Sequence, residues 1–261
     1  MREMRCFLAE SDGDSEVSNS WAGTSGTGKI GPFWSLRAVV DGKVDGRTGY
    51  LCGLKDIDEW LRGSILPFLR KAAGPLPASI AVIAKALIEL FPTAVVHCPK
   101  PAALQSLELR VSPYLHLAVI NGDEHMVRLT QSFEFSASHR LYVESLSEED
   151  NQRVFGKCAN PNGHGHNYIV EVTIRGTPEE RTGNLIELPQ LESIVKERVI
   201  DRFDHKHLNL DCVEFQALNP SVENITRVIW QRLVGALDDS MLDTVRVWET
   251  AKTYAEYCGG E

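Results

Sequence analysis

An internal repeat is the feature that most limits what this chain can fold into. Residues 33–42 align without a gap with residues 167–176, which lie 134 positions later in the chain. The same register continues from residues 47–51 to residues 181–185. Self-similarity at a fixed offset indicates two copies of one supersecondary unit. We therefore expect two tandem units that share a fold.

A polar stretch at residues 121–124 is the expected boundary between the copies. The units are then residues 1–124 and residues 125–261, and each is long enough to bury its own core. Hydrophobic residues make up 43% and charged residues 24% of the 261 positions. These are the proportions of an ordinary globular protein, so disorder, collagen and coiled coil are excluded as the main structure.

Charge and cysteine usage limit the partners of the chain. The formal net charge is -9, which argues against a diffuse basic surface and hence against a nucleic-acid partner. Six cysteines occur singly without a C-x-x-C pair, and no apolar segment follows the first residues. No run of 18 apolar residues occurs, so we expect no membrane partner. A reduced, cytoplasmic protein is the expectation.

The second copy has a clear pattern of strands and helices. Apolar residues alternate where strands are expected and recur at helical spacing where helices are expected. The expected strands are residues 127–138, 168–174, 245–249 and a short one near Tyr254, and the expected helices are residues 188–203 and one that opens at Ser221. The order ββααββ predicts an α+β fold, with an antiparallel sheet and helices on one face.

Three histidines of the second copy form a candidate metal site. Alternate residues of a strand face the same way, so His164 and His166 present their imidazoles on one side, with Gly165 between them. His139 reaches the same point if its strand pairs with theirs. Three imidazoles with an open fourth position are typical of catalytic zinc. The alternative, two histidines that merely solvate a strand end, has about equal weight.

Other side chains near this point have the chemistry of catalysis. Cys158 lies in a polar loop beside Lys157 and near the candidate metal, surroundings that lower the pKa of a thiol. A lone cysteine is, however, usually a small buried hydrophobe. Asp204 precedes His205 directly, and its carboxylate can orient the imidazole of His205 only if the two side chains meet. Glu249 ends a buried row and could bind a guanidine-like edge, or could equally lie in water or pair with an arginine.

Several short motifs together resemble the 6-pyruvoyl tetrahydropterin synthase family. The resemblance covers residues 127–259 and rests on residues 135–141, Cys158 with His164-Gly165-His166-Asn167-Tyr168, Asp204-His205-Lys206 with Leu208-Asn209, Glu223-Asn224 and Glu249-Thr250. It implies the tunnelling fold, in which ββααββ units assemble into a barrel with active sites at unit interfaces.

The resemblance also implies residue roles. The zinc ligands would be His139, His164 and His166; Cys158 would be the principal base, with Asp204 and His205 as proton-relay partners; Glu249 would anchor the pterin ring, and Glu223 and Ser221 would line its site. Val222 replaces the usual threonine of the family, so one hydroxyl contact is missing.

The implied substrate is 7,8-dihydroneopterin triphosphate. The five-residue gap between Cys158 and His164 favours 6-pyruvoyl tetrahydropterin as the product. The alternatives are a 6-carboxytetrahydropterin synthase of the queuosine pathway, in which the gap is usually three, and a pterin-binding protein without turnover. Lys157, Arg153 and Lys206 are candidates to bind the triphosphate.

The first copy lacks this chemistry. In the alignment of the copies, Ile30 and Pro32 replace His164 and His166, and Val111 replaces Glu249. We therefore expect residues 1–124 to be a degenerate scaffold copy, and a homo-oligomer of three two-unit chains to form the barrel. Residues 23–29 nearly match a phosphate-binding P-loop but lack its serine or threonine, so nucleotide binding is not expected.

Overall fold

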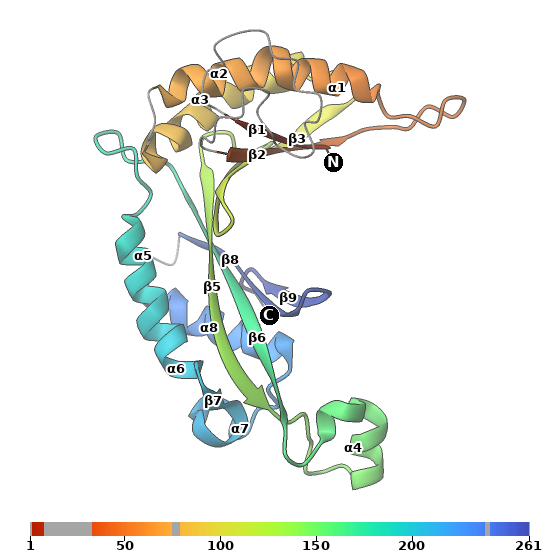
Figure 1. Ribbon diagram of the computed structural model, residues 1–261, viewed down its shortest axis with the longest axis vertical. Helices are drawn as coiled ribbons and strands as arrows, with labels where there is room; N and C mark the ends of the chain where they lie inside the picture. The colour runs from red at the N-terminus through yellow and green to blue at the C-terminus, as the bar shows by residue number, and fades with distance from the viewer. Residues whose placement is uncertain (1, 8–32, 75–78, 238–240, 261) are drawn as a thin grey trace. The chain divides into compact units, whose positions relative to one another are not determined.

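A computed structural model describes residues 2–7, 33–74, 79–237 and 241–260 (Figure 1). Contacts divide the chain into two compact units. The first comprises Met1–Leu129 with Arg175–Leu185, and the second comprises Thr130–Ile174 with Ile186–Glu261. The division lies a few residues after the predicted boundary and assigns one later segment to the first unit. It does not test whether the units are copies, so the repeat remains a prediction. The P-loop-like segment lies outside the described residues.

The first unit is a four-stranded antiparallel sheet with helices on one face (Figure 1). Its elements are β1 (Arg2–Phe7), β2 (Phe33–Asp41), α1 (Leu54–Trp60), the π-helical turn η1 (Leu61–Ile65), α2 (Leu66–Ala73), α3 (Ile80–His97), β3 (Ala103–Ser112) and β4 (Leu115–Ile120). Leu36 and Leu107 of the sheet and Leu87 and Phe91 of α3 are fully or almost fully buried in one core.

Helix α3 is the one described helix that is long and apolar enough to cross a membrane by length and composition. The sequence-based expectation found no such segment, because Lys85 and Glu89 interrupt the apolar run. The described helix nevertheless packs its inner face, including Ile83 and Leu90, into the core of the first unit. Its apolar character is therefore accounted for by packing within the unit.

The second unit has the predicted order of strands and helices. Its main elements are β5 (Val127–His139), β6 (His164–Gly176), α5 (Leu188–Val195), the π-helical turn η3 (Lys196–Ile200), α6 (Asp201–Phe203), α8 (Val222–Val234), β8 (Leu242–Thr250) and β9 (Thr253–Tyr257). The strands lie in the order β5-β6-β8-β9. The predicted second helix is confirmed, because the Ser221 side chain caps α8.

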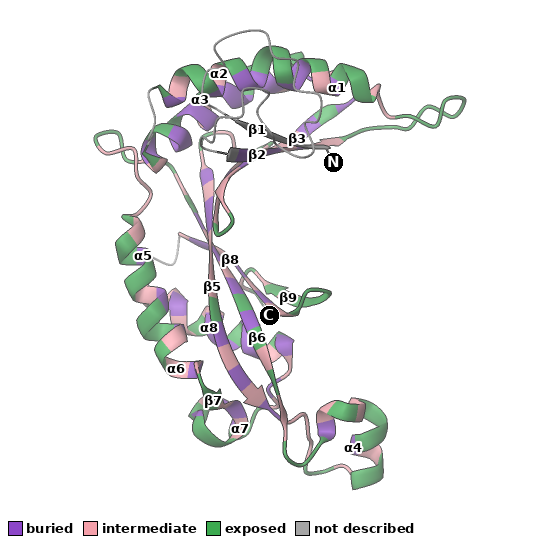
Figure 2. Ribbon diagram, in the orientation of Figure 1, coloured by how far each residue is buried: buried purple, intermediate pink, exposed green. Residues whose placement is uncertain are grey.

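Alternation along β6 confirms which face of the sheet is buried. Tyr168, Val170 and Val172 are fully buried, whereas Ile169 between them is exposed (Figure 2). The ring of Phe135 in β5 stacks on Tyr168, with centroids 5.0 Å apart, and contacts Phe203 of α6. This aromatic contact joins the two strands that carry the candidate site to the helix behind them.

Two short segments were not predicted. The first is α4 (Glu148–Phe155) with the 3-10 turn η2 (Gly156–Ala159), which connects β5 to β6. The second comprises β7 (Lys206–His207), α7 (Leu208–Asp211) and the 3-10 turn η4 (Val213–Phe215), and β7 pairs in parallel with the end of β5. Each lies beside residues of the candidate site, and neither is long enough to show a clear apolar period.

Phe135→Ala should destabilise the second unit strongly. Truncation of a buried aromatic ring costs about 3 to 5 kcal/mol, because the contacts with Tyr168 and Phe203 are lost and a cavity remains. Urea denaturation followed by aromatic fluorescence measures the change. Val154→Ala, at an exposed position of α4, is the matched control and should stay within about 0.5 kcal/mol of wild type. Equal midpoints for the two variants would contradict this packing.

Candidate active site

Three histidines converge at the ends of β5 and β6. His139 is the last residue of β5, and His164 and His166 lie on the buried face at the start of β6. One ring nitrogen from each lies within 4.8 Å of the others, and the Nε2 atoms of His139 and His164 are 3.1 Å apart. The predicted convergence of these three side chains is therefore confirmed.

The ring of His139 is held in one orientation. Its Nδ1 lies 2.7 Å from the carbonyl oxygen of Pro220, which can only accept a hydrogen bond. Nδ1 must therefore carry the proton, and the lone pair of Nε2 is directed at the other two histidines. The Tyr168 hydroxyl lies 3.4 Å from the same Nε2. A fixed tautomer of this kind is the usual arrangement of a metal-ligating histidine.

The cluster fits a divalent metal ion. Nitrogen ligands at tetrahedral zinc lie about 3.3 Å from one another, and the Nε2 atoms of His139 and His164 have nearly this spacing, at 3.1 Å. The Nε2 of His166 and the Nδ1 of His164 are buried without a hydrogen-bond partner in the described structure. Burial lowers the pKa of His139 to about 4, and burial together with His166 lowers the pKa of His164. Both rings are therefore neutral near pH 7, as metal ligation requires.

Glu249 joins the histidine cluster. Its Oε1 lies 3.5 Å from the Nε2 of His139 and 3.7 Å from the Nε2 of His166. The prediction that Glu249 continues the inward face of β8 is confirmed, because Val245 and Val247 before it are fully buried. The carboxylate is only partly exposed, so an N–H donor of a bound ligand would stabilise it.

Cys158 is held beside the cluster by its backbone. Its carbonyl accepts a hydrogen bond from the backbone N–H of Leu141 at 2.9 Å, and Arg140 donates from Nε to the carbonyl of Ala159 at 2.9 Å. Partial burial, and then the charge of Glu249, raise the pKa of the thiol. The protein groups around Cys158 therefore raise the pKa of the thiol, in contrast to the expected lowering, and Lys157 is not among the causes of the shift.

Asp204 and His205 form the predicted pair. The Oδ2 of Asp204 lies 2.8 Å from the Nδ1 of His205, so the two side chains do meet. The backbone N–H of Ser136 donates to Asp204, and this hydrogen bond is the main reason that the pKa of the carboxyl is lowered. His205 adopts a left-handed backbone conformation with φ of 56° and donates from its backbone N–H to the Ser136 carbonyl. Its side chain is 83% exposed.

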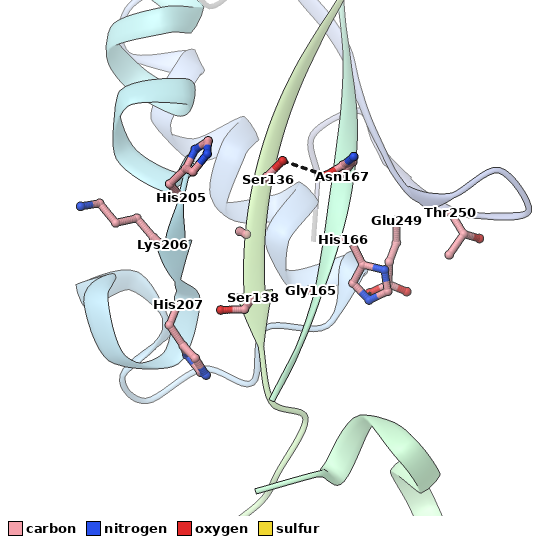
Figure 3. A pocket seen from close by; sticks show the side chains of 11 residues that line it. Ser136, Ser138, Gly165, His166, Asn167, His205, Lys206, His207, Glu249 and Thr250 are labelled. Atoms are coloured by element: carbon pink, nitrogen blue, oxygen red, sulfur yellow. Dashed lines mark hydrogen bonds and ion pairs between the residues drawn. The ribbon is translucent and has the colours of Figure 1, made fainter. Parts of the chain in front are cut away.

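A hollow of about 680 Å³ lies over the ends of β5, β6 and β7. Its lining consists of Ser136, Ala137, Ser138, Gly165, His166, Asn167, His205, Lys206, His207, Glu249 and Thr250. His205 and Lys206 lie on one side of β5, whereas His166 and Glu249 lie on the other (Figure 3). The candidate relay pair and the histidine cluster therefore flank the strand that connects them.

The remaining candidates lie at the edge of this arrangement. Ser221 and Glu223 are at the start of α8, directly after Pro220, and are not among the residues that line the hollow. Their role in binding substrate remains a prediction. Of the candidates for triphosphate binding, Lys206 lines the hollow, whereas Arg153 forms an ion pair with Asp150.

Sequence reasoning missed the groups that hold the site in place. The side chain of Asn209 accepts from the backbone N–H of Arg140 and donates to its carbonyl, at 2.8 and 3.0 Å. The fully buried Asn151 bonds through its amide to both backbone groups of Val143. Pro220 contributes only its backbone carbonyl oxygen, which accepts the hydrogen bond from His139. Asn209 belongs to one of the motifs that carry the resemblance, but its motif gave no role for it; a single amide at Asn151 and a backbone oxygen at Pro220 form no sequence pattern, so no signal pointed to them.

The pKa of His139 predicts how stability depends on pH. Between pH 6.5 and 4 the unfolded chain binds a proton at this position that the folded chain does not bind. The free energy of unfolding of the metal-free protein should therefore be retained above pH 6.5 and fall as the pH is lowered toward 4. Urea midpoints from pH 7.5 to 4.5 should show a shallower dependence for His139→Gln than for wild type. Equal dependences would contradict the assignment.

Comparison with known proteins covers the second unit. Residues 128–260 match the family model described as 6-pyruvoyl tetrahydropterin synthase. The human 6-pyruvoyl tetrahydrobiopterin synthase is 39% identical over 138 residues, which are 53% of this chain and 95% of the human protein. A 6-carboxy-5,6,7,8-tetrahydropterin synthase of Haemophilus influenzae is 28% identical over 51% of this chain and 99% of its own length.

A solved structure is similar to the same part of the chain. The Caenorhabditis elegans 6-pyruvoyl tetrahydropterin synthase is 34% identical and has a TM-score of 0.50, with 52% of this chain and 96% of that chain covered. The curled antiparallel sheet with helices of the second unit agrees with the predicted tunnelling fold. On the match of more than half its residues, the chain belongs to the 6-pyruvoyl tetrahydropterin synthase family.

Proposed function

We propose that this chain is a zinc-dependent 6-pyruvoyl tetrahydropterin synthase that acts on 7,8-dihydroneopterin triphosphate. The observation that carries the proposal is the cluster of three histidines with Glu249 and Cys158 beside it. Higher identity to the human synthase than to the Haemophilus influenzae carboxy-type synthase supports the pyruvoyl product. The carboxy product is the second candidate, because both kinds of relative match nearly their full length.

The metal site is the first part of the proposed mechanism. His139, His164 and His166 would hold zinc, and the hydrogen bond to Pro220 fixes the direction of the first ligand. Zinc, when bound, supplies Lewis acidity toward the hydroxyl oxygens of the substrate side chain. Glu249 accepts hydrogen bonds from the N–H groups of the pterin ring and so orients that side chain toward the histidines.

Proton movement is the task of the remaining residues. Cys158 removes a proton from the side-chain carbon next to the one that bears triphosphate; the electron pair of the broken C–H bond forms a carbon–carbon double bond as the C–O bond to triphosphate breaks. His205 is the second acid or base, and Asp204 stabilises its protonated form through the 2.8 Å contact. Because burial and Glu249 raise the pKa of Cys158, the thiol needs a nearby positive charge to become an efficient base.

The first unit and the assembly complete the proposal. Residues 1–124 would be a degenerate copy that serves as scaffold, in a homo-oligomer of three two-unit chains. The position of His205 supports a shared site, because its exposed ring lies across β5 from His166 (Figure 3). In such an assembly the ring could serve a histidine cluster other than the one in its own unit.

An assay with 7,8-dihydroneopterin triphosphate tests the proposal. The purified protein should release triphosphate and form a product with the mass of 6-pyruvoyl tetrahydropterin. Cys158→Ala should lower kcat at least about a hundredfold, since general acid–base groups typically contribute 10² to 10⁴. Cys258→Ala, which removes an exposed thiol elsewhere in the second unit, is the control. The mass of the carboxy product would select the second candidate, and binding without turnover would refute the enzyme.

Metal analysis tests the ligand set and the degenerate copy together. The protein should carry one equivalent of zinc per chain, because one histidine cluster is proposed. His164→Ala should lower this toward zero while circular dichroism shows the fold retained, as expected for a catalytic metal. Two equivalents in the wild type would refute the degenerate copy, and a full equivalent in His164→Ala would refute the ligand set.

A further inference from the structure

The loop between β2 and α1, residues 42–53, has a specific internal structure. The backbone N–H of Asp45 donates to the Tyr50 carbonyl at 2.9 Å, and that of Gly49 donates to the Asp45 carbonyl at 2.9 Å. The hydroxyl of Thr48 bonds to the Asp45 carboxylate and accepts from the N–H of Tyr50. Gly49 has a φ of +71°. We call these residues the first loop.

Residues 175–185, between β6 and α5, repeat these bonds one for one. The backbone N–H of Glu179 donates to the Asn184 carbonyl at 3.0 Å. The backbone N–H of Gly183, whose φ is +74°, donates to the Glu179 carbonyl at 2.7 Å. The hydroxyl of Thr182 bonds to the Glu179 carboxylate and accepts from the N–H of Asn184. We call this segment the second loop. The alignment that pairs residues 47–51 with 181–185 therefore pairs residues with the same backbone structure.

The second loop has a docking position within the first unit, to which its contacts assign it. A Cβ added at Gly183 would lie 3.0 Å from the Cβ of Ala81, so the loop backbone touches the start of α3. Leu185 packs against the buried core of the same unit. The contact therefore consists of a glycine turn against the first turn of a helix, with an apolar side chain anchored beside it.

The first loop is exposed throughout its turn, although it has the same structure. Figure 1 shows it projecting between β2 and α1, and Figure 2 shows it coloured as exposed. Val44, Tyr50 and Leu54 in and after this loop are 55%, 60% and 57% exposed. Three large apolar side chains are therefore exposed on one short projecting segment, which makes the segment a candidate interaction site.

The second unit has a helix start like the one that receives the second loop. Ser79 caps α3 and Ser221 caps α8, and each hydroxyl accepts from the backbone N–H three residues later, at 3.3 and 3.4 Å. Ala81 lies two residues after the first cap, and Glu223 lies two residues after the second. The start of α8 therefore has the same capped geometry as the helix start on which the second loop packs, with the carboxylate of Glu223 at the position of Ala81.

We propose that the first loop docks on the start of α8 in a second copy of this chain. Charge supports this occupant, because the first loop carries the exposed Lys43 and Arg47 and the start of α8 presents the exposed Glu223. The contact is heterologous, since a loop of one unit meets a helix of the other unit. Contacts of this kind close into a ring when the rotation permits.

The docked loop lies at the edge of the histidine cluster. The start of α8 directly follows Pro220, whose carbonyl orients the ring of His139. The first unit thus contributes a wall beside the site of its neighbour, without a metal ligand of its own. This inference depends on the loop structure and not on the proposed reaction, so an inactive protein would leave it standing.

A double variant, Tyr50→Ser with Leu54→Ser, tests the surface. The dissociation constant of the assembly should rise at least tenfold, as measured by sedimentation or light scattering across a dilution series. Both positions are exposed, so circular dichroism should show an unchanged fold. Tyr114→Ser is the matched control, because Tyr114 is an equally exposed aromatic residue of the first unit outside the loop. Unchanged assembly of the double variant, or a wild type that remains a single chain, would overturn the proposal.

Cross-linking between two chains identifies the occupant. A chain with Tyr50→Cys mixed with a chain with Glu223→Cys should give, on mild oxidation, a disulfide-linked pair, with peptides joined at positions 50 and 223 by mass spectrometry. A chain with Tyr114→Cys in place of Tyr50→Cys should give no such peptide. An assembled protein without the 50-to-223 link would show that another surface holds the copies together.

Discussion

The hydrogen bond from His139 to the Pro220 carbonyl is the contact on which the candidate site depends. It joins the end of β5 to the residue before the cap of α8, and it sets the tautomer of a fully buried imidazole. Burial lowers the pKa of that ring, so it stays neutral and directs its Nε2 at His164. Loss of the carbonyl partner would leave a buried N–H unsatisfied, which costs about 1 to 3 kcal/mol.

The rest of the site is fixed by amides that clamp the backbone just after His139. Asn209 bonds to both backbone groups of Arg140, and Asn151 bonds to those of Val143. Asn209 follows the segment of Asp204 and His205, so the same clamp that holds the histidine strand also ties down the relay pair. Hydrogen bonds from side-chain amides to the backbone therefore help to set the geometry of the site.

Periodicity was sufficient to predict the strands and helices of the second unit, because each has one buried face. It also placed the three histidines and Glu249 on one side, since alternation in β5, β6 and β8 fixes the direction of each side chain. It could not predict α4, whose capping and buried Asn151 replace an apolar stripe. Nor could it give the direction of the pKa shift of Cys158, which depends first on burial and then on Glu249, a residue distant in sequence.

If the first unit is the degenerate copy that we propose, the two units differ in the features that chemistry requires. In the sequence alignment, Val111 occupies the position of Glu249, at the end of an inward row that Leu107 and Leu109 share with Val245 and Val247. Burying a carboxylate is unfavourable unless a ligand or a metal compensates it, whereas Val111 packs against the core at no such cost. The glycine loop, by contrast, needs only a threonine, an acid and one residue with positive φ. A loop of this kind can therefore form in a unit that has no metal site.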